Sequence, residues 1–199
     1  AGQAYSITDA KSCGPVTGTI NVTEPTAISF TSADVTTAID CNGGTATVTI
    51  AATGGTAPIS YTFNGTTNTT GIFTGVLAGA GQAYSITDAK SCGPVTGKIT
   101  VTEPTTLVVT ETMTSHVDVT CYLGTDGSFT VTTTGGTGSY SYSIDNTDFS
   151  NTKGVFSGLS AGTYTVYVKD VNGCKDSTSV TIIDGDGTDP VVTAPANDS

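Results

Sequence analysis

Residues 80–104 repeat residues 1–25 almost without change, and this repeat limits what the chain can fold into. The first 18 residues of the two stretches are identical, AGQAYSITDAKSCGPVTG, and the offset from Ala1 to Ala80 is 79 residues. A weaker third copy, Ala161–Cys174, retains the Ala-Gly pair, a tyrosine, an aspartate and the cysteine. A period near 80 residues is too long for a solenoid repeat and is typical of a small self-contained domain.

The period predicts four segments in the 199 residues. Residues 1–25 are the C-terminal part of a repeat that we expect to begin upstream. Residues 26–104 and 105–184 are full repeats, and residues 185–199 form an acidic linker with the start of a next domain. Each full repeat is so small that its hydrophobic core alone would be marginally stable.

Alternation of apolar and polar residues predicts β-strands throughout the chain. Val48 and Ile50 alternate with threonine, the same period of two runs through Ile59, Tyr61 and Phe63, and no helical periodicity competes with it. Glycine-rich turns separate about seven short strands in each full repeat. The fold class is therefore all-β, with tandem immunoglobulin-like β-sandwiches of about 80 residues each. The segment from Leu159 to Tyr164 predicts a corner in which the tyrosine hydroxyl bonds back to the backbone.

Five cysteines lie at equivalent places in the repeats. We predict two disulfides, each between a cysteine near the start and one near the end of a full repeat: Cys41 with Cys92, and Cys121 with Cys174. Cys13 occupies the slot of Cys92, so its partner would lie upstream. Zinc is the alternative, although the chain has no CxxC and only one histidine. Disulfides indicate an oxidising, exported setting.

The chain is acidic. Seventeen Asp and Glu oppose six lysines, for a net charge of −11. Nucleic-acid recognition needs a basic face, so nucleic acids and anionic membranes are not expected partners, and no apolar run is long enough to insert into a membrane. We expect an extracellular or cell-surface location.

Near the C-terminus, Asp184, Asp186 and Asp189 alternate with glycine in a pattern that can surround a hard cation. They predict a calcium site, the only cofactor that the sequence suggests, which would stiffen a domain junction. The alternative is a flexible acidic linker.

No catalytic set recurs from repeat to repeat. His116 is the only histidine and has no counterpart in the preceding repeat, so we interpret it as an ordinary strand residue. Asp145 and Asp148 lie in a predicted hairpin loop and are interpreted as turn formers rather than as a glycosidase pair. The prediction is a protein that is not an enzyme.

Between Cys121 and Cys174 the chain contains the motifs GSFTV, GGTGSYSYS and FSGLSAGTYTVYVKDVNGC. In these motifs and their spacing, the sequence resembles the SprB repeat of bacterial gliding adhesins. The resemblance implies tandem repeats in a large surface protein exported by type IX secretion, and a stalk or filament that serves adhesion or gliding. Neighbouring repeats are therefore expected partners. Threonine-rich edge strands could also pair other copies of the chain into a fibre. The alternative function is a carbohydrate-binding module attached to a secreted enzyme.

Overall fold

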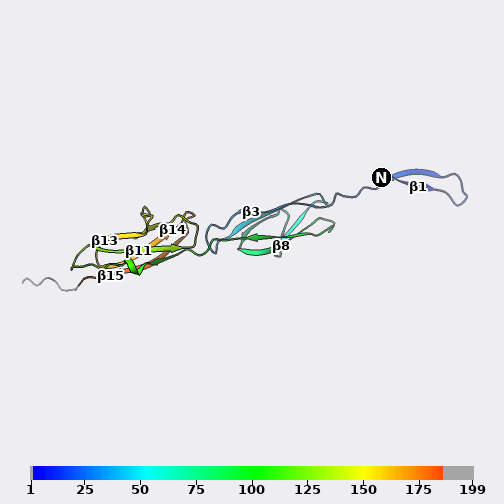
Figure 1. The fold of residues 1–199 in the computed structure, drawn as a ribbon. Helices are drawn as coiled ribbons and strands as arrows, with labels where there is room; N and C mark the ends of the chain where they lie inside the picture. Colours follow the sequence, from blue (N-terminus) through cyan, green and yellow to red (C-terminus); the bar gives the residue numbers. More distant parts are fainter. Residues whose placement is uncertain (1, 186–199) are drawn as a thin grey trace, which may run out of the picture. The chain divides into compact units, whose positions relative to one another are not determined.

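The computed structural model describes residues 2–185, almost entirely as β-strands and loops (Figure 1). The chain forms two compact units. The first comprises the residues up to Thr37 together with Ala46–Val101, and the second comprises Ala38–Thr45 with the chain from Thr102 onward. The predicted boundary after Pro104 lies three residues beyond the observed one after Val101, but the grouping of residues 38–45 with the second unit was not predicted.

Within the first unit, the strands between Ser29 and Val101 form two antiparallel sheets. One sheet has the order β3-β4-β7 and the other the order β6-β5-β8-β9. Their strands are β3 (Ser29–Thr37), β4 (Ala46–Thr53), β5 (Ser60–Phe63), β6 (Thr66–Asn68), β7 (Ile72–Val76), β8 (Gly79–Thr87) and β9 (Val95–Val101). This division of strands between two sheets is that of an immunoglobulin-like sandwich.

Period-two patterning decides which side chains enter the core of the first unit. Along β4, Ala46, Val48 and Ile50 are buried, and the threonines between them are only partly buried. Phe63 from β5 and Phe73 from β7 meet between the sheets with ring centroids 5.4 Å apart. Two β-sheets thus close over one shared apolar layer, as the alternation predicts.

The second unit repeats the plan with one strand fewer. Its sheets have the orders β10-β11-β13 and β12-β14-β15. The strands are β10 (Val108–Glu111), β11 (Gly127–Thr134), β12 (Ser141–Ser143), β13 (Val155–Leu159), β14 (Gly162–Lys169) and β15 (Lys175–Ile182), with a single 3-10 turn η1 (Met113–Ser115). At the centre of its core, Phe129 is fully buried and packs against Phe156 and Tyr164.

The N-terminal hairpin stands as a sheet of its own. Strand β1 (Gly2–Ile7) pairs only with β2 (Val16–Asn21), in the register that β8 and β9 also use. Ile86 in β8 is fully buried, whereas the identical Ile7 is 63% exposed, because β5 and the opposite sheet cover only β8. Burial here depends on the neighbouring strands and not on the local sequence.

Two segments depart from regular strand pairing. The stretch Val117–Cys121 alternates apolar and polar residues, but it makes only a single bridge, between Val117 and Ser128. Strand β3 pairs with β4 across β-bulges, one between Phe30 and Ser32 and one between Val35 and Thr37. In both places the apolar pattern is present but a turn or bulge changes the pairing.

Within the described residues, the three-residue η1 is the only helix, and no helix has the length or apolarity to span a membrane.

Gly97 in β9 leaves space for the ring of a tyrosine in the neighbouring strand β8. Gly97 lies opposite Tyr84, and a Cβ at Gly97 would overlap the Tyr84 ring. Tyr84 is buried and stacks on Phe30, with ring centroids 5.7 Å apart. The pair recurs as Gly18 and Tyr5 in the N-terminal hairpin.

We expect Gly97→Ala to lower the free energy of unfolding of the first unit by about 1–3 kcal/mol, because the new methyl group must displace a packed ring. Urea unfolding followed by hydrogen exchange in residues 79–101 measures this. Gly138→Ala in the second unit, read by exchange in β11 and β14, is the control, since nothing lies within 4 Å of a Cβ there. Equal losses in the two variants would contradict the packing role of Gly97.

Candidate functional site

A buried carboxylate organises the hairpin between β14 and β15. Asp170 is only 3% exposed. Its Oδ1 accepts the backbone N–H groups of Asn172 at 3.0 Å and Cys174 at 2.9 Å, and its Oδ2 accepts that of Thr137 at 2.9 Å. One side chain therefore fixes the turn that carries Cys174 and ties it to the loop that follows β11.

The same aspartate recurs four residues before each hairpin cysteine. Asp88 accepts the N–H groups of Lys90, Cys92 and Thr56 at 2.9, 2.8 and 2.9 Å. These donors, Thr56 first, lower the pKa of Asp88. In the N-terminal hairpin Asp9 accepts the N–H groups of Lys11 and Cys13, each at 2.9 Å. The sequence shows this aspartate in all three copies, but its role as the cap of the cysteine turn emerges only from the structure.

Cys174 forms a disulfide with Cys41, with the two Cα atoms 5.6 Å apart. Cys41 lies in the loop of residues 38–45, which connects β3 to β4 in the chain and belongs to the second unit. The disulfide thus joins a loop of the repeat 26–104 to the hairpin of the repeat that follows it. Cys13, Cys92 and Cys121 are free and exposed.

Hydrogen bonds hold loop 38–45 beside the disulfide. Asn42 donates from Nδ2 to the carbonyl of Pro104 at 3.1 Å and accepts at Oδ1 from the Thr106 hydroxyl at 3.0 Å. The Gly43 N–H donates to the Glu103 carboxylate at 2.6 Å, and Asn172 Nδ2 donates to the Asp40 carbonyl at 3.1 Å. Ile39 in this loop is buried. The loop is therefore hydrogen-bonded to the second unit and not only tethered to it by the disulfide.

The predicted pairs Cys41–Cys92 and Cys121–Cys174 are wrong, because each pair lies at opposite ends of a sandwich. Cys41 precedes β4, whereas Cys92 lies in the hairpin that Asp88 ties to Thr56, beyond the end of β4. A strand of eight residues spans about 26 Å, and a disulfide allows a Cα separation of only about 4.4–6.8 Å. In the second unit, β11 separates Cys121 from the Cys174 hairpin in the same way.

The structure bears on the zinc alternative and on part of the predicted calcium site. The zinc alternative fails for Cys41 and Cys174, whose sulfurs are bonded to each other. Of the predicted calcium ligands, Asp186 and Asp189 lie outside the described residues. Asp184 is partly buried, and among the described residues nothing donates to its Oδ1. Calcium binding stays a prediction.

His116 lies between two carboxylates. Its Nδ1 contacts Glu111 and its Nε2 lies 3.0 Å from Asp118 Oδ1, which also accepts the N–H of Ile183 at 2.8 Å. The hydrogen bond with Glu111, followed by that with Asp118, raises the pKa of His116. The Ile183 N–H and then His116 lower the pKa of Asp118. Within residues 2–185, no serine or cysteine bonds to the ring. Through Asp118, the cluster links the segment after η1 to Ile183, the residue that follows β15, and we call it a structural clasp.

This clasp makes stability depend on pH in two directions. His116 has a raised pKa, so its contribution is complete below its ordinary value of 6.5 and is lost as the pH rises through the folded value. Asp118 has a lowered pKa, so its contribution is complete above 3.8 and is lost as the pH falls through the folded value. We expect calorimetry to show a lower Tm of the second unit at pH 8.5 than at pH 5.5, and His116→Gln to reduce that difference. An unchanged difference in His116→Gln would assign it to other groups.

Two smaller predictions are confirmed. The Tyr164 hydroxyl donates to the Ser160 carbonyl at 2.8 Å, which is the predicted tyrosine corner. The Ser143 hydroxyl donates to Asp145 Oδ1, as do the N–H groups of Thr147 at 2.8 Å and Asp148 at 2.9 Å, and these bonds, that of Ser143 first, lower the pKa of Asp145. Asp145 is a turn former.

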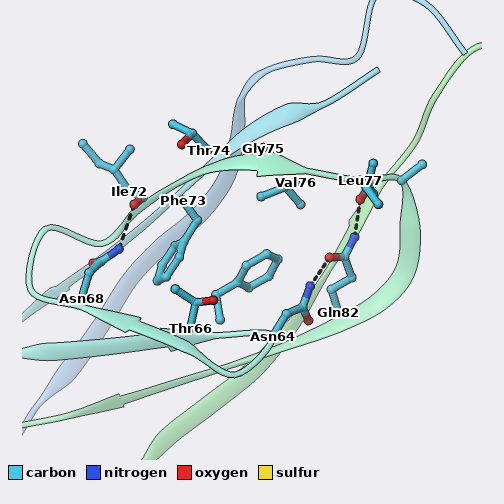
Figure 2. Close-up of a pocket in the computed structure, with 12 residues that line it drawn as sticks. Asn64, Thr66, Asn68, Ile72, Phe73, Thr74, Gly75, Val76, Leu77 and Gln82 are labelled. Atoms are coloured by element: carbon cyan, nitrogen blue, oxygen red, sulfur yellow. Dashed lines mark hydrogen bonds between the residues drawn. The ribbon is translucent and has the colours of Figure 1, made fainter. Parts of the chain in front are cut away.

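A pocket of about 450 Å³ opens in the first unit between β5, β6 and β7 (Figure 2). Two of its polar side chains are engaged in hydrogen bonds: Asn64 donates to Gln82, and Gln82 donates to the Leu77 carbonyl. Its two aromatic rings, Phe63 and Phe73, are buried. The pocket therefore presents no exposed aromatic platform on which a sugar ring could stack.

The strand order and the cysteine loop define the chain as a tandem array of immunoglobulin-like β-sandwiches in which one repeat is disulfide-bonded to a loop of the repeat before it. Residues 114–149 match the family model described as the SprB repeat. The predicted resemblance to this family of cell-surface repeats is thereby confirmed over these residues, which run from η1 through β12 into the loop of Asp145.

Two solved structures resemble the chain in outline. One is the C-terminal 282-residue fragment of intimin in complex with the intimin-binding domain of the translocated intimin receptor, at 17% identity over 78% of this chain and 64% of that one, with a TM-score of 0.43. The other is the three N-terminal domains of Hoc, the highly immunogenic outer capsid protein of bacteriophage RB49, at 17% identity over 79% and 59%, with a TM-score of 0.39.

The chain spans about three fifths of the length of these two structures, and likeness at this level says nothing about function. Among proteins with curated descriptions, none matches the sequence.

Proposed function

We propose that this chain is a spacer segment of a large exported cell-surface adhesin, a stalk whose repeats set the distance between the cell and a binding region. The observation that carries the proposal is the path of the chain through one sandwich. In the second unit, β10 begins at Val108, opposite the C-terminal end of β11 at Thr134. Strand β15 ends at Ile182, opposite Gly162 at the start of β14. A Cβ at Gly127, the start of β11, would touch Ile182, so the chain enters at one end of the sandwich and leaves at the other.

This path suits a spacer because each added repeat moves the chain forward by the length of a sandwich. The near-identity of residues 1–25 and 80–104 supports the same function, since a spacer depends on the number of its units and not on differences between them. The proposal has four further parts: a role in adhesion and gliding, export by type IX secretion, assembly of several chains into a fibre, and calcium binding at the C-terminal aspartates. The SprB match supports the surface location.

The experiment is to lengthen the chain by whole copies of residues 26–104 and to measure particle length by electron microscopy. We expect about 35–45 Å for each added repeat, from strand length plus loops. Particles that become wider without lengthening would refute the spacer. The carbohydrate-binding alternative has its own readout: saturable binding to a glycan array, lost on filling the pocket by Thr66→Leu, would favour it.

A further inference from the structure

We propose that the loop of residues 118–125 is a docking site for the cysteine hairpin of a further repeat that follows in the same chain, and that Cys121 forms a disulfide with that hairpin. The partner is thus a segment with the chemistry of residues 170–174: a buried aspartate, a turn and a cysteine. The observed bond follows this rule, since the loop cysteine of the repeat 26–104 pairs with the hairpin cysteine of the next repeat.

Loop 118–125 has the same local structure as loop 38–45. The Gly124 N–H donates to the Cys121 carbonyl at 2.8 Å, and the Gly44 N–H donates to the Cys41 carbonyl at 2.9 Å. Val119 and Ile39, each two residues before the cysteine, are both buried. Cys121 is therefore presented on the same turn as Cys41, but it is exposed and its thiol is free.

The surface beside Cys121 is apolar and uncovered in the described part of the chain. Leu123 is 77% exposed and has a positive φ of 56°, and Tyr122 is 43% exposed. The corresponding residues of the bonded loop are Asn42 and Gly43, which hydrogen-bond to Pro104 and Glu103. The two loops thus occupy one position in the repeat, and the free one exposes a pair of large side chains that a docked domain would cover.

The hairpins supply the complementary half of the site. Cys13 and Cys92 are free, exposed and held by an aspartate cap that matches the cap of the bonded Cys174. By the same rule, each of these hairpins bonds to the loop cysteine of a repeat that precedes it. Every repeat would then carry one bond toward the repeat before it and one toward the repeat after it.

Each bond forms by oxidation of two thiols. The thiolate of one cysteine attacks a mixed disulfide on the other, and the pair gives up two electrons and two protons to an external disulfide, which is reduced to two thiols. In the test below the oxidant is oxidised glutathione in a glutathione redox buffer.

The test inserts one copy of residues 105–185 into the full chain directly after Gly185 and ahead of residues 186–199, so that the copy follows in the register in which Thr105 follows Pro104. The appended copy carries Lys175→Arg, and all chains carry Cys13→Ser, because Cys13 and Cys41 would otherwise share the tryptic peptide 12–90. Trypsin then separates Cys121 in peptide 99–153 from Cys174 in peptide 170–175, and the arginine marks the appended hairpin by mass.

Under non-reducing conditions we expect peptide 99–153 to be linked to the arginine-marked hairpin peptide, and peptide 12–90 to be linked to the unmarked one. Cys121→Ser in the extended chain is the matched control, and it should free the marked hairpin while leaving the Cys41–Cys174 bond intact. A link from Cys121 to Cys174, a free Cys121, or a bond between ¹⁴N- and ¹⁵N-labelled chains would each overturn the proposal. Bond connectivity is read independently of particle length, so this test and that of the spacer can fail separately.

Discussion

The double variant Cys41→Ser/Cys174→Ser is expected to lower the free energy of unfolding of the second unit by about 2–5 kcal/mol. The bond closes a loop with a sequence separation of 133 residues, for which the chain-entropy model gives about 5 kcal/mol. Strands β4 to β9 of the folded first unit lie within that loop and already restrain part of it, so we expect a value below this limit. Without the disulfide, loop 38–45 is held to the rest of the second unit only by its four hydrogen bonds.

The measurement is hydrogen exchange of the intact chain in urea, read separately in β11 and β14 for the second unit and in β4 and β8 for the first. The chain has no tryptophan, so tryptophan fluorescence cannot be used to distinguish the two units. Cys121→Ser is the matched control, because this cysteine is exposed and unbonded, and it should change stability by less than about 0.5 kcal/mol. If the control and the double variant behaved alike, the disulfide would have no stabilising role.

Asp170→Ala is expected to cost the second unit about 3–5 kcal/mol, because three backbone N–H groups lose a charged acceptor in a place that is 3% exposed. Two of these groups, at Asn172 and Cys174, shape the turn, and the third, at Thr137, joins the turn to the loop after β11. We therefore also expect slower formation of the Cys41–Cys174 bond during oxidative refolding. Amide exchange at the three donors and the rate of disulfide formation are the measurements.

Two further variants are compared with Asp170→Ala. Asp170→Asn keeps an oxygen for the two turn amides and should lose about half as much stability as the alanine variant. Asp148→Ala removes an exposed carboxylate that accepts only the Ser150 N–H, at 2.9 Å, and should be nearly neutral. Equal destabilisation by Asp148→Ala and Asp170→Ala would contradict the role of Asp170 as the cap of the cysteine turn.

The sandwich could be predicted from the sequence because its determinants are local. Val48 and Ile50 alternate with threonine, and Gly54-Gly55 marks the turn that follows, so the strands and their buried faces are readable one segment at a time. The tyrosine corner at Tyr164 is likewise contained in a few residues.

The disulfide could not be read in this way, because the near-equal spacing of Cys41–Cys92 and Cys121–Cys174 suggested a bond within each repeat. What decides the pairing is the end of the sandwich at which each cysteine lies, and that depends on strand direction over the whole repeat. Two signals were present. Each loop cysteine precedes a strand and each hairpin cysteine follows one, and Asp9, Asp88 and Asp170 mark the hairpin turn in every copy.

The sulfur bond also determines how the chain responds to being pulled. The shortest covalent route from one terminus to the other runs along residues 1–41, across the two sulfur atoms and on from residue 174. Everything between the bonded cysteines is bypassed, so a separation of 133 residues, worth about 450 Å when fully extended, cannot be drawn out while the bond remains oxidised. A reductant would therefore release this additional length and make the chain more extensible under force.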